Sequence, residues 1–363
     1  MKRHPNYVDY FFYIWALLLI VALLFTKSSV TEDKCRYYDE KIAASRLAKT
    51  AMEEIKAYKE ECNIPLATED TYQSGMIGDR YTVITTTLGN LQSKKTSVNP
   101  NFAAVIIDMF KEAEIKPGDE VAMIFSSSFP ALNLCVMAAA EVFNLKTCVM
   151  ISLGASSYGA NDPVFTYLEM AEHLKQEGYF TKNIDYVSLG GESDLGTEFP
   201  EDIRNQLLQR IEESSAELIY IEDYVTNIDN RLEKITKKLP NVRALINVGG
   251  NLVSMGKDEE SFSEKNGLIF PTYIKSRLNR DFTKIGLIDR FLDRKIPIMQ
   301  MLNIKGLALE YGLPYNPPVI PEVGDGDVYY EAQYGLTVPF IALGISVILP
   351  GLYYGYRKKY LIL

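Results

Sequence analysis

A loop of glycine, serine and asparagine at residues 154–163 (GASSYGANDP) combines residue types that bind anions. The apolar, β-prone run 146–151 precedes this loop, and a helix-like run begins at 164. A helix that starts directly after such a loop presents backbone N–H groups and the positive end of its dipole there. We therefore expect the loop residues Ser156, Ser157 and Asn161 to bind a negatively charged group.

Three further loops follow predicted strands and carry the same residue types. They are SSSFP (126–130), GGESDLG (190–196) and GGNLVSMG (249–256), and they supply Ser126, Ser127, Ser128, Glu192, Asp194 and Asn251. The carboxyl ends of parallel strands meet at one edge of a sheet, where α/β proteins bind ligands at a switch in strand order. We therefore predict that the four loops gather into one ligand site. The alternative is that these glycines and serines only form short turns and helix caps.

An upstream stretch rich in threonine and glycine, residues 71–99, places hydroxyls close to cations in the sequence. Thr85, Thr86 and Thr87 are followed by Lys94 and Lys95. Hydroxyl donors combined with ammonium groups suit a carboxylate or a phosphate, so all five residues are candidates for ligand binding. A β-strand with a charged turn would give the same pattern, and both interpretations stay open.

Histidine is too scarce for most acid–base sites. The chain has two histidines, His4 near the N-terminus and His173 in a predicted helix, where it is expected to face solvent. A Ser-His-Asp triad is therefore disfavoured, and the GxSxG motif is absent. A serine–lysine pair stays open, with one of the serines at 126–128 as nucleophile and Lys94 or Lys95 as base.

Acidic side chains offer a second chemistry. Glu169, Glu192 and Asp194 lie near predicted strand ends, where carboxylates act as acid/base groups or as metal ligands. The alternative is that they are solvated turn residues. No HExxH, Walker A, EF-hand, GxGxxG or CxxC motif is present, so the sequence assigns neither a metal nor a cofactor.

Alternating strands and helices predict an α/β domain with a parallel sheet and flanking helices. Predicted strands cover 120–125, 146–151, 184–189, 217–221 and 242–248, and predicted helices cover 102–113, 131–143, 164–176, 201–213 and 227–239. These βα repeats occupy residues 100–256. A long helix over 28–63 and the 71–99 stretch precede them, and residues 257–335 form a C-terminal part without assigned elements.

Two apolar segments near the chain ends, 10–26 and 336–354, each approach the ~20 residues that cross a bilayer. We predict one transmembrane helix at each end and a folded domain over 28–335 between them. The alternative is a cleavable signal peptide together with a buried core helix.

Positive charges flank both apolar segments on their outer sides. Lys2 and Arg3 lie in the tail 1–9, and three cations lie at 357–359 in the tail 355–363. The positive-inside rule places both tails in the cytoplasm. The sequence therefore predicts a cytoplasmic-membrane protein whose main domain is extracytoplasmic.

The stretch between the apolar segments is acidic. The whole chain carries a formal charge of −9, and its two ends contribute +1 and +3, which leaves −13 for residues 27–335. Nucleic-acid binding proteins carry basic surfaces, so this class of function is excluded.

The four cysteines do not form an evident disulfide framework. Cys35 and Cys62 lie near the two ends of the predicted 28–63 helix, which would separate them by about 40 Å, whereas a disulfide spans a Cα distance of ~7 Å. Cys135 and Cys148 lie in apolar elements and are expected to be buried free thiols.

Several long motifs carry a family resemblance. They are 75–104 (GMIGDRYTVITTTLGNLQSKKTSVNPNFAA), 118–133 (GDEVAMIFSSSFPALN), 154–170 (GASSYGANDPVFTYLEM), 298–314 (IMQMLNIKGLALEYGLP) and 328–330 (VYY). Together they resemble the poly-γ-glutamate system protein family, bacterial membrane proteins that accompany the poly-γ-glutamate synthase and its small membrane partners. One position departs from the family pattern, because Ser127 stands where a glycine is expected.

The resemblance implies a membrane-anchored accessory component of poly-γ-glutamate synthesis, processing or export. Its implied partners are poly-γ-glutamate or γ-glutamyl oligomers, the synthase with its membrane partners, and the lipid bilayer. Combined with the loops above, this favours a carboxylate-rich ligand. Two alternatives stay open: an extracytoplasmic hydrolase or transferase acting on γ-glutamyl amides, and a scaffold for the synthase complex.

Overall fold

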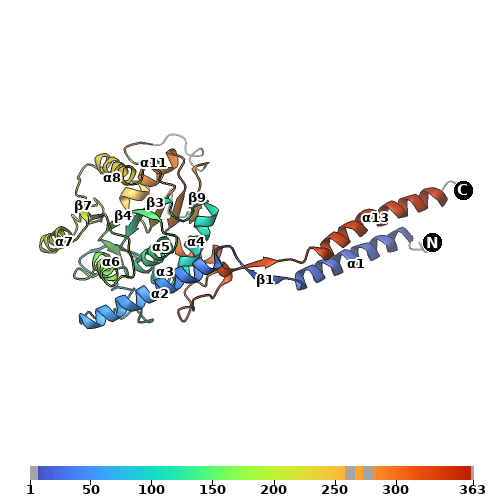
Figure 1. Cartoon of the computed structure of the whole chain (residues 1–363), viewed down its shortest axis with the longest axis horizontal. Coiled ribbons are helices and arrows are strands. Elements are labelled where there is room, and N and C mark those ends of the chain that lie inside the picture. The colour runs from blue at the N-terminus through green and yellow to red at the C-terminus, as the bar shows by residue number, and fades with distance from the viewer. Residues whose placement is uncertain (1–6, 258–265, 273–280, 361–363) are drawn as a thin grey trace, which may run out of the picture. The chain divides into compact units, whose positions relative to one another are not determined.

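The computed structural model describes residues 7–257, 266–272 and 281–360 (Figure 1). The chain forms two compact units. The larger unit is Tyr37–Tyr329, and the smaller unit combines Met1–Arg36 with Tyr330–Leu363. The predicted domain over 28–335 is therefore trimmed at both ends, because residues 28–36 and 330–335 belong to the smaller unit.

A seven-stranded sheet forms the centre of the larger unit. Its strand order is β7-β6-β4-β3-β8-β10-β9, and every neighbouring pair is parallel except β10 and β9. The strands are β3 (Glu120–Ser126), β4 (Lys146–Ser152), β6 (Tyr186–Ser188), β7 (Glu217–Leu218), β8 (Ala244–Val248), β9 (Gly267–Ile269) and β10 (Ile298–Met301). The predicted α/β class with a largely parallel sheet is confirmed.

Apolar side chains cover both faces of this sheet, which explains why its central strands are continuous hydrophobic runs. On β3, Val121, Met123 and Phe125 belong to one core cluster, while Ala122 and Ile124 belong to a second. The first cluster receives side chains from α2 (Tyr38–Glu61), α4 (Phe102–Glu112), α5 (Pro130–Val142), α6 (Tyr167–Gln176), α7 (Glu201–Glu213) and α12 (Ile304–Glu310). The second receives them from α8 (Tyr224–Lys238), α9 (Leu252–Met255) and α11 (Leu287–Asp293). Helices therefore cover both sides of the sheet (Figure 1).

The direction of chain progress reverses between β3 and β8. From β3 the chain continues to β4, β6 and β7 on one side, and it then returns to β8 on the other side of β3 before reaching β10. The loops that follow β3 and β8 lead away from each other, which leaves a crevice at the carboxyl ends of these two strands.

A small parallel sheet joins two stretches that are distant in sequence. β2 (Thr85–Thr87) pairs with β5 (Ala155–Ser156), so the threonine run lies beside the GASSYGANDP loop. The helix α3 (Leu91–Ser97) follows β2, and its N-cap Asn90 accepts a hydrogen bond from the backbone N–H of Ser93 at 2.9 Å. This arrangement brings Lys94 of α3 close to the loop serines.

Residues 257–335, which carried no predicted elements, complete the sheet. β10 pairs in parallel with β8, from Ile298 opposite Leu245 to Met301 opposite Val248. β9 closes the edge as an antiparallel strand. The sheet therefore extends beyond the predicted repeats at 100–256.

The smaller unit contains two long helices and a two-stranded ribbon. Helices α1 (Tyr7–Ser28) and α13 (Thr337–Tyr360) contact each other, and Trp15 Nε1 donates to Ser346 Oγ at 3.4 Å. β1 (Thr31–Lys34) pairs antiparallel with β11 (Tyr330–Gln333).

Among the described residues, one helical stretch, Thr337–Gly355, is long and apolar enough to cross a membrane. It coincides with the predicted C-terminal segment 336–354. The apolar part of α1, Phe12–Ser28, is shorter, so the N-terminal span at 10–26 stays a prediction. Lys2 and Arg3, on which the predicted orientation partly depends, lie outside the described residues.

The continuous helix predicted over 28–63 is interrupted. α1 ends at Ser28, β1 follows, and α2 begins after Tyr37, whose φ of 63° lies in the left-handed region. The polar run of β1 is extended because it pairs with β11. This tertiary contact overrides the local helical pattern.

Cys62, Cys135 and Cys148 are free thiols, as expected for Cys135 and Cys148. Cys62 is exposed, whereas Cys35, Cys135 and Cys148 are buried. Burial raises the pKa of the Cys148 thiol to about 12, so this thiol stays protonated and unreactive.

Candidate functional site

A pocket of about 640 Å³ lies at the carboxyl ends of the central strands. Five loops line it, those after β3, β4, β6, β8 and β10, together with the stretch from β2 to α3, residues 86–94. The lining residues are Thr86, Thr87, Leu88, Gly89, Asn90, Ser93, Lys94, Ser126, Ser128, Phe129, Ser152, Gly154, Ser156, Gly190, Gly191, Glu192, Asp194, Gly250, Asn251, Leu252, Met255 and Leu302. The strand order explains this convergence, because the β3–β8 reversal lies at its centre.

Nine of the fourteen predicted site residues line this pocket. They are Thr86, Thr87, Lys94, Ser126, Ser128, Ser156, Glu192, Asp194 and Asn251. The other five, Thr85, Lys95, Ser127, Ser157 and Asn161, do not line it. Each predicted loop therefore contributes, but not every polar residue in it.

The residues outside the pocket hold the loops in place. Asn161 Nδ2 donates to Thr85 Oγ1 at 2.9 Å and to the carbonyl of Asp79 at 2.8 Å. The backbone N–H of Ser157 donates to the carbonyl of Thr87 at 2.9 Å. Lys95 lies over the ring of Tyr72, 5.7 Å from its centroid. These four residues make contacts that hold the loops and do not line the pocket, so their role in ligand binding stays a prediction.

Ser127 also has a structural position. Its Oγ donates to the carbonyl of Ser152 at 2.7 Å, and its own carbonyl accepts from the N–H of Ala160. A β-carbon added to Gly159 would lie 2.8 Å from the carbonyl oxygen of Ser127. The backbones of the two facing loops therefore approach each other closely at Gly159, where a side chain would not fit.

Lys94 is the one cation among the lining residues of this pocket. Its side chain is buried, and its Nζ donates to the carbonyl of Ser128 and lies 2.8 Å from Ser156 Oγ. The ring of Phe129 lies 3.9 Å from the same nitrogen. Within the described ranges, no carboxylate lies within 4.0 Å of it, and the loss of hydration lowers the pKa of Lys94 well below its ordinary value.

Three serines form a hydrogen-bonded chain beside Lys94. Ser126 Oγ donates to Ser128 Oγ at 2.8 Å, and the backbone N–H of Ser156 donates to the same oxygen at 2.9 Å. All three side chains are buried. The β3 loop and the β5 strand are therefore joined through Ser128.

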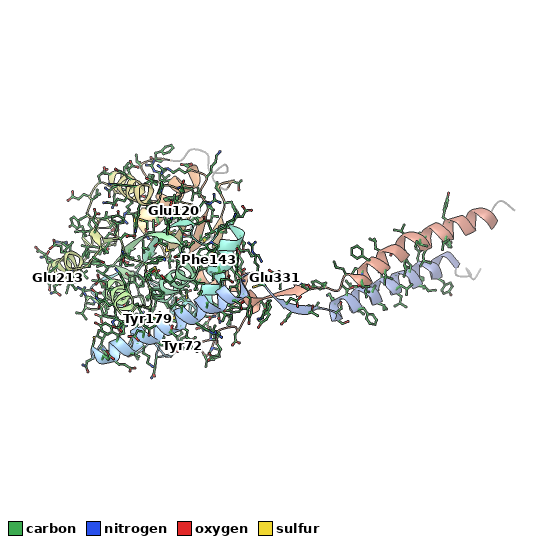
Figure 2. All side chains as sticks on the ribbon, viewed as in Figure 1. Tyr72, Glu120, Phe143, Tyr179, Glu213 and Glu331 are labelled. Atoms are coloured by element: carbon green, nitrogen blue, oxygen red, sulfur yellow. The ribbon has the colours of Figure 1, made fainter. Side chains whose placement is uncertain are left out.

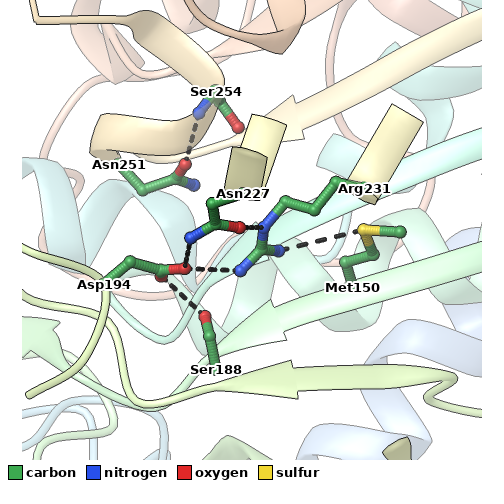
Figure 3. A network of polar contacts seen from close by, with 7 residues as sticks. All are labelled: Met150, Ser188, Asp194, Asn227, Arg231, Asn251 and Ser254. Atoms are coloured by element: carbon green, nitrogen blue, oxygen red, sulfur yellow. Dashed lines mark hydrogen bonds and ion pairs between the residues drawn. The ribbon is translucent and has the colours of Figure 1, made fainter. Parts of the chain in front are cut away.

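Asp194 belongs to a buried ion pair (Figure 3). Its carboxylate accepts from Arg231 Nη2 at 2.6 Å, from Ser188 Oγ at 2.7 Å and from Asn227 Nδ2 at 3.0 Å. Arg231 is 1% exposed and also donates to Asn227 Oδ1 at 2.9 Å. Since its carboxylate accepts three hydrogen bonds and its charge is matched by Arg231, Asp194 is a structural part of the pocket lining.

Other lining side chains remain available to a ligand. The hydroxyls of Thr86, Thr87 and Ser93 make no hydrogen bond to another described residue. Asn251 caps α9 through its Oδ1, and its Nδ2 lacks a partner in the described chain. Glu192 is exposed at the rim. The pocket wall is thus rich in neutral hydrogen-bonding groups.

Two residues from the acid–base discussion lie outside the pocket. His173 is half-buried, contrary to the prediction that it faces solvent. Its Nε2 lies 2.8 Å from Glu54 Oε1, and its ring stacks on Tyr58 at 3.6 Å. Glu169 forms the capping box of α6 and pairs with Arg210 at 3.0 Å. Neither residue is placed to act on a ligand in the pocket.

Sequence reasoning missed several lining residues. Asn90, Ser93 and Phe129 were not predicted, although Asn90 has the sequence signal of a helix N-cap. Leu302 follows β10 and could not be placed without the sheet order. Among the described residues, no group of three or more His, Cys, Asp or Glu side chains is arranged to bind a metal ion.

No family model matches the chain, and the comparison with curated proteins finds no relative. What the site can do therefore follows from its geometry. It combines neutral donors suited to an anion, the amino end of α5 immediately after Phe129, and a buried amine beside a serine hydroxyl.

Proposed function

We propose that this chain is a membrane-anchored accessory component of poly-γ-glutamate synthesis, processing or export, and that its strand-end pocket binds γ-glutamyl chains. The observation that carries the binding proposal is the convergence of hydroxyl and amide groups on one pocket of about 640 Å³. The motif resemblance supplies the identity of the polymer. The apolar stretch Thr337–Gly355 supports membrane anchoring, and the predicted arrangement keeps both termini cytoplasmic.

Neutral donors suit a carboxylate in an otherwise acidic protein. The stretch between the apolar segments carries −13, so a polyanion is repelled at long range, but salt screens this repulsion beyond about 8–10 Å. Affinity must then come from short-range hydrogen bonds at Thr86, Ser93 and the amino end of α5. A basic polyanion-binding surface loses affinity steeply as the salt concentration rises. We expect this pocket to keep most of its affinity for γ-glutamyl chains when the salt concentration is raised.

Binding is tested with the full chain in detergent and γ-linked glutamate oligomers, measured by isothermal titration calorimetry. The double variant Thr86→Val with Ser93→Ala removes two donors, each contributing about 0.5–1.5 kcal/mol, so affinity should fall about tenfold. Thr50→Val, on the exposed face of α2, is the matched control and should bind like the wild type. Absence of wild-type binding in both low and moderate salt would refute the binding proposal.

The ligand class is tested separately with oligomers of γ-linked isoglutamine, in which a carboxamide replaces each free α-carboxylate. These retain the amide chain length but lack the α-carboxylates, so they should bind at least tenfold more weakly than γ-linked glutamate. Equal affinity for the two oligomers would show that carboxylates are not recognised.

A further inference from the structure

The hydroxyl of Ser156 and the amine of Lys94 meet at the inner wall of the pocket, 2.8 Å apart. Ser156 is 7% exposed and Lys94 is 2% exposed. We propose that Ser156 is a nucleophile and Lys94 its general base, and that the pair cleaves or transfers amide bonds of the bound chain. The substrate class rests on the proposed function, whereas the serine–lysine chemistry rests on this geometry alone.

The surroundings of Lys94 favour a neutral amine. Burial removes its hydration, and in the described chain no carboxylate within 4.0 Å compensates. The carbonyl of Ser128 and the ring of Phe129 favour the ammonium form. They are weaker than a counter-ion, so burial dominates and the pKa of Lys94 lies well below its ordinary value.

A neutral amine has the right hydrogen-bonding groups for these two neighbours. In the structure Lys94 Nζ donates to the carbonyl of Ser128 and to Ser156 Oγ. A neutral amine can keep the first hydrogen bond and turn its lone pair toward the Ser156 hydroxyl, 2.8 Å away. That is the arrangement of a general base with its nucleophile. An ammonium group in the same place would need an anion that the described protein does not supply.

The fold selects Ser156 over the other serines. Ser126 and Ser128 are hydrogen-bonded to each other, and Ser128 Oγ also accepts from the backbone N–H of Ser156. These two serines are therefore positioning residues. The sequence predicted a nucleophile among the serines at 126–128, whereas we propose Ser156 on the facing loop.

The proposed reaction balances without a cofactor. Ser156 Oγ attacks the amide carbonyl carbon while its proton passes to Lys94 Nζ. The C–N bond then breaks, and Lys94 returns the proton to the leaving amine. An ester on Ser156 remains. Water, or the amine of a second chain, attacks this ester and gives a proton to Lys94. The ester C–O bond then breaks, and Lys94 returns the proton to Ser156 Oγ, which completes hydrolysis or transfer and restores the pair. The amino end of α5 follows Phe129, which lines the pocket, and the positive end of this helix dipole favours negative charge on the carbonyl oxygen.

The test uses a fluorophosphonate probe on the full chain in detergent, with the adduct located by peptide mass spectrometry. The serine oxygen bonds to phosphorus and fluoride leaves, so no γ-glutamyl ligand is needed. We expect labelling at Ser156, with a rate that rises with pH through the lowered pKa of Lys94. Lys94→Met should slow labelling about 10²- to 10⁴-fold, the usual contribution of a general base. Lys95→Met, which changes the neighbouring lysine outside the pocket, should label normally.

A second variant covers the case in which Lys94→Met fails to fold. In Ser156→Cys, the introduced thiol should be alkylated faster at pH 7 than the exposed Cys62 of the same molecule. An alkylation rate no faster than that of Cys62 would count against Lys94 as a base.

The outcomes separate the two proposals. Absence of a Ser156 adduct between pH 6 and 10, in folded protein that binds γ-glutamyl oligomers, overturns the serine–lysine chemistry and leaves binding intact. A Ser156 adduct in protein that binds no oligomer supports the chemistry and overturns the proposed ligand. Labelling that Lys94→Met leaves unchanged shows that Lys94 is only a structural link to Ser128.

Discussion

Replacing Asp194 by asparagine tests how much the buried ion pair beside the pocket contributes to the stability of the larger unit. Asp194 and Arg231 are 3% and 1% exposed, and their charged atoms lie 2.6 Å apart. Asparagine tolerates the φ of 63° found at this position, so backbone strain is not added. The change removes the one carboxylate that the Arg231 guanidinium contacts in the described chain and leaves a buried charge unmatched.

The expected loss of stability is large. Breaking a buried pair on one side costs about 3–5 kcal/mol of unfolding free energy. The amide oxygen of asparagine can still accept a hydrogen bond, so we expect a loss at the lower end, about 3 kcal/mol. For a unit of this size, 1 kcal/mol corresponds to roughly 2–4 °C in melting temperature. We therefore expect a decrease of roughly 6–12 °C.

Glu217→Gln is the matched control. Glu217 pairs with Lys234, which lies on the same helix α8 as Arg231, but the Glu217 side chain is 60% exposed. Surface pairs contribute about 0–1 kcal/mol, so this variant should melt within about 3 °C of the wild type. Adding Arg231→Met to Asp194→Asn should recover part of the loss, since no unmatched charge then remains.

Circular dichroism is the suitable assay. The single tryptophan, Trp15, lies in α1 of the smaller unit, so its fluorescence does not report on the larger unit. If Asp194→Asn and Glu217→Gln shift the melting temperature equally, the argument from burial is refuted.

Two further predictions concern protonation and thiol reactivity. The hydrogen bond with His173 lowers the pKa of Glu54 below its ordinary value. The carboxylate therefore stabilises the fold above the unfolded pKa, and this effect is lost as pH falls through the folded pKa. The melting temperatures of the wild type and Glu54→Gln should differ at pH 7 and converge in acid, below the folded pKa of Glu54, and a constant difference would contradict the linkage. Tyr179, labelled in Figure 2, donates to the same carboxylate at 3.1 Å. Cys62 is the single exposed cysteine, so a colorimetric thiol assay should count one fast-reacting thiol in the native chain and four after denaturation, and a second fast thiol would disprove the burial of Cys35, Cys135 or Cys148.

Local sequence patterns were sufficient for the central α/β repeats. The helix predicted at 201–213 matches α7, and the strand predicted at 146–151 lies within β4, because apolar runs and caps report directly on these elements. The β10 strand was missed. It has only four residues and follows a loop, so its place beside β8 depends on tertiary pairing rather than on its own pattern.

For the candidate site, too, one part was predictable from the sequence and another part was not. Its location follows from a general property of parallel sheets, and nine of the predicted residues lie there. Which hydroxyl faces the pocket was not predictable. Ser156 and Ser157 are neighbours, but Ser156 reaches Lys94 while Ser157 bonds back to Thr87, and only the β2–β5 pairing determines this difference.

The larger unit begins and ends in one place. The rings of Tyr38 and Tyr329, residues from its two ends, have centroids 6.2 Å apart. The chain therefore enters the larger unit after β1 and leaves it before β11 at nearly the same point. Its natural ends could be joined by a short linker and new ends opened in a surface loop such as Glu177–Gly178, which would give a circular permutant with the same sheet.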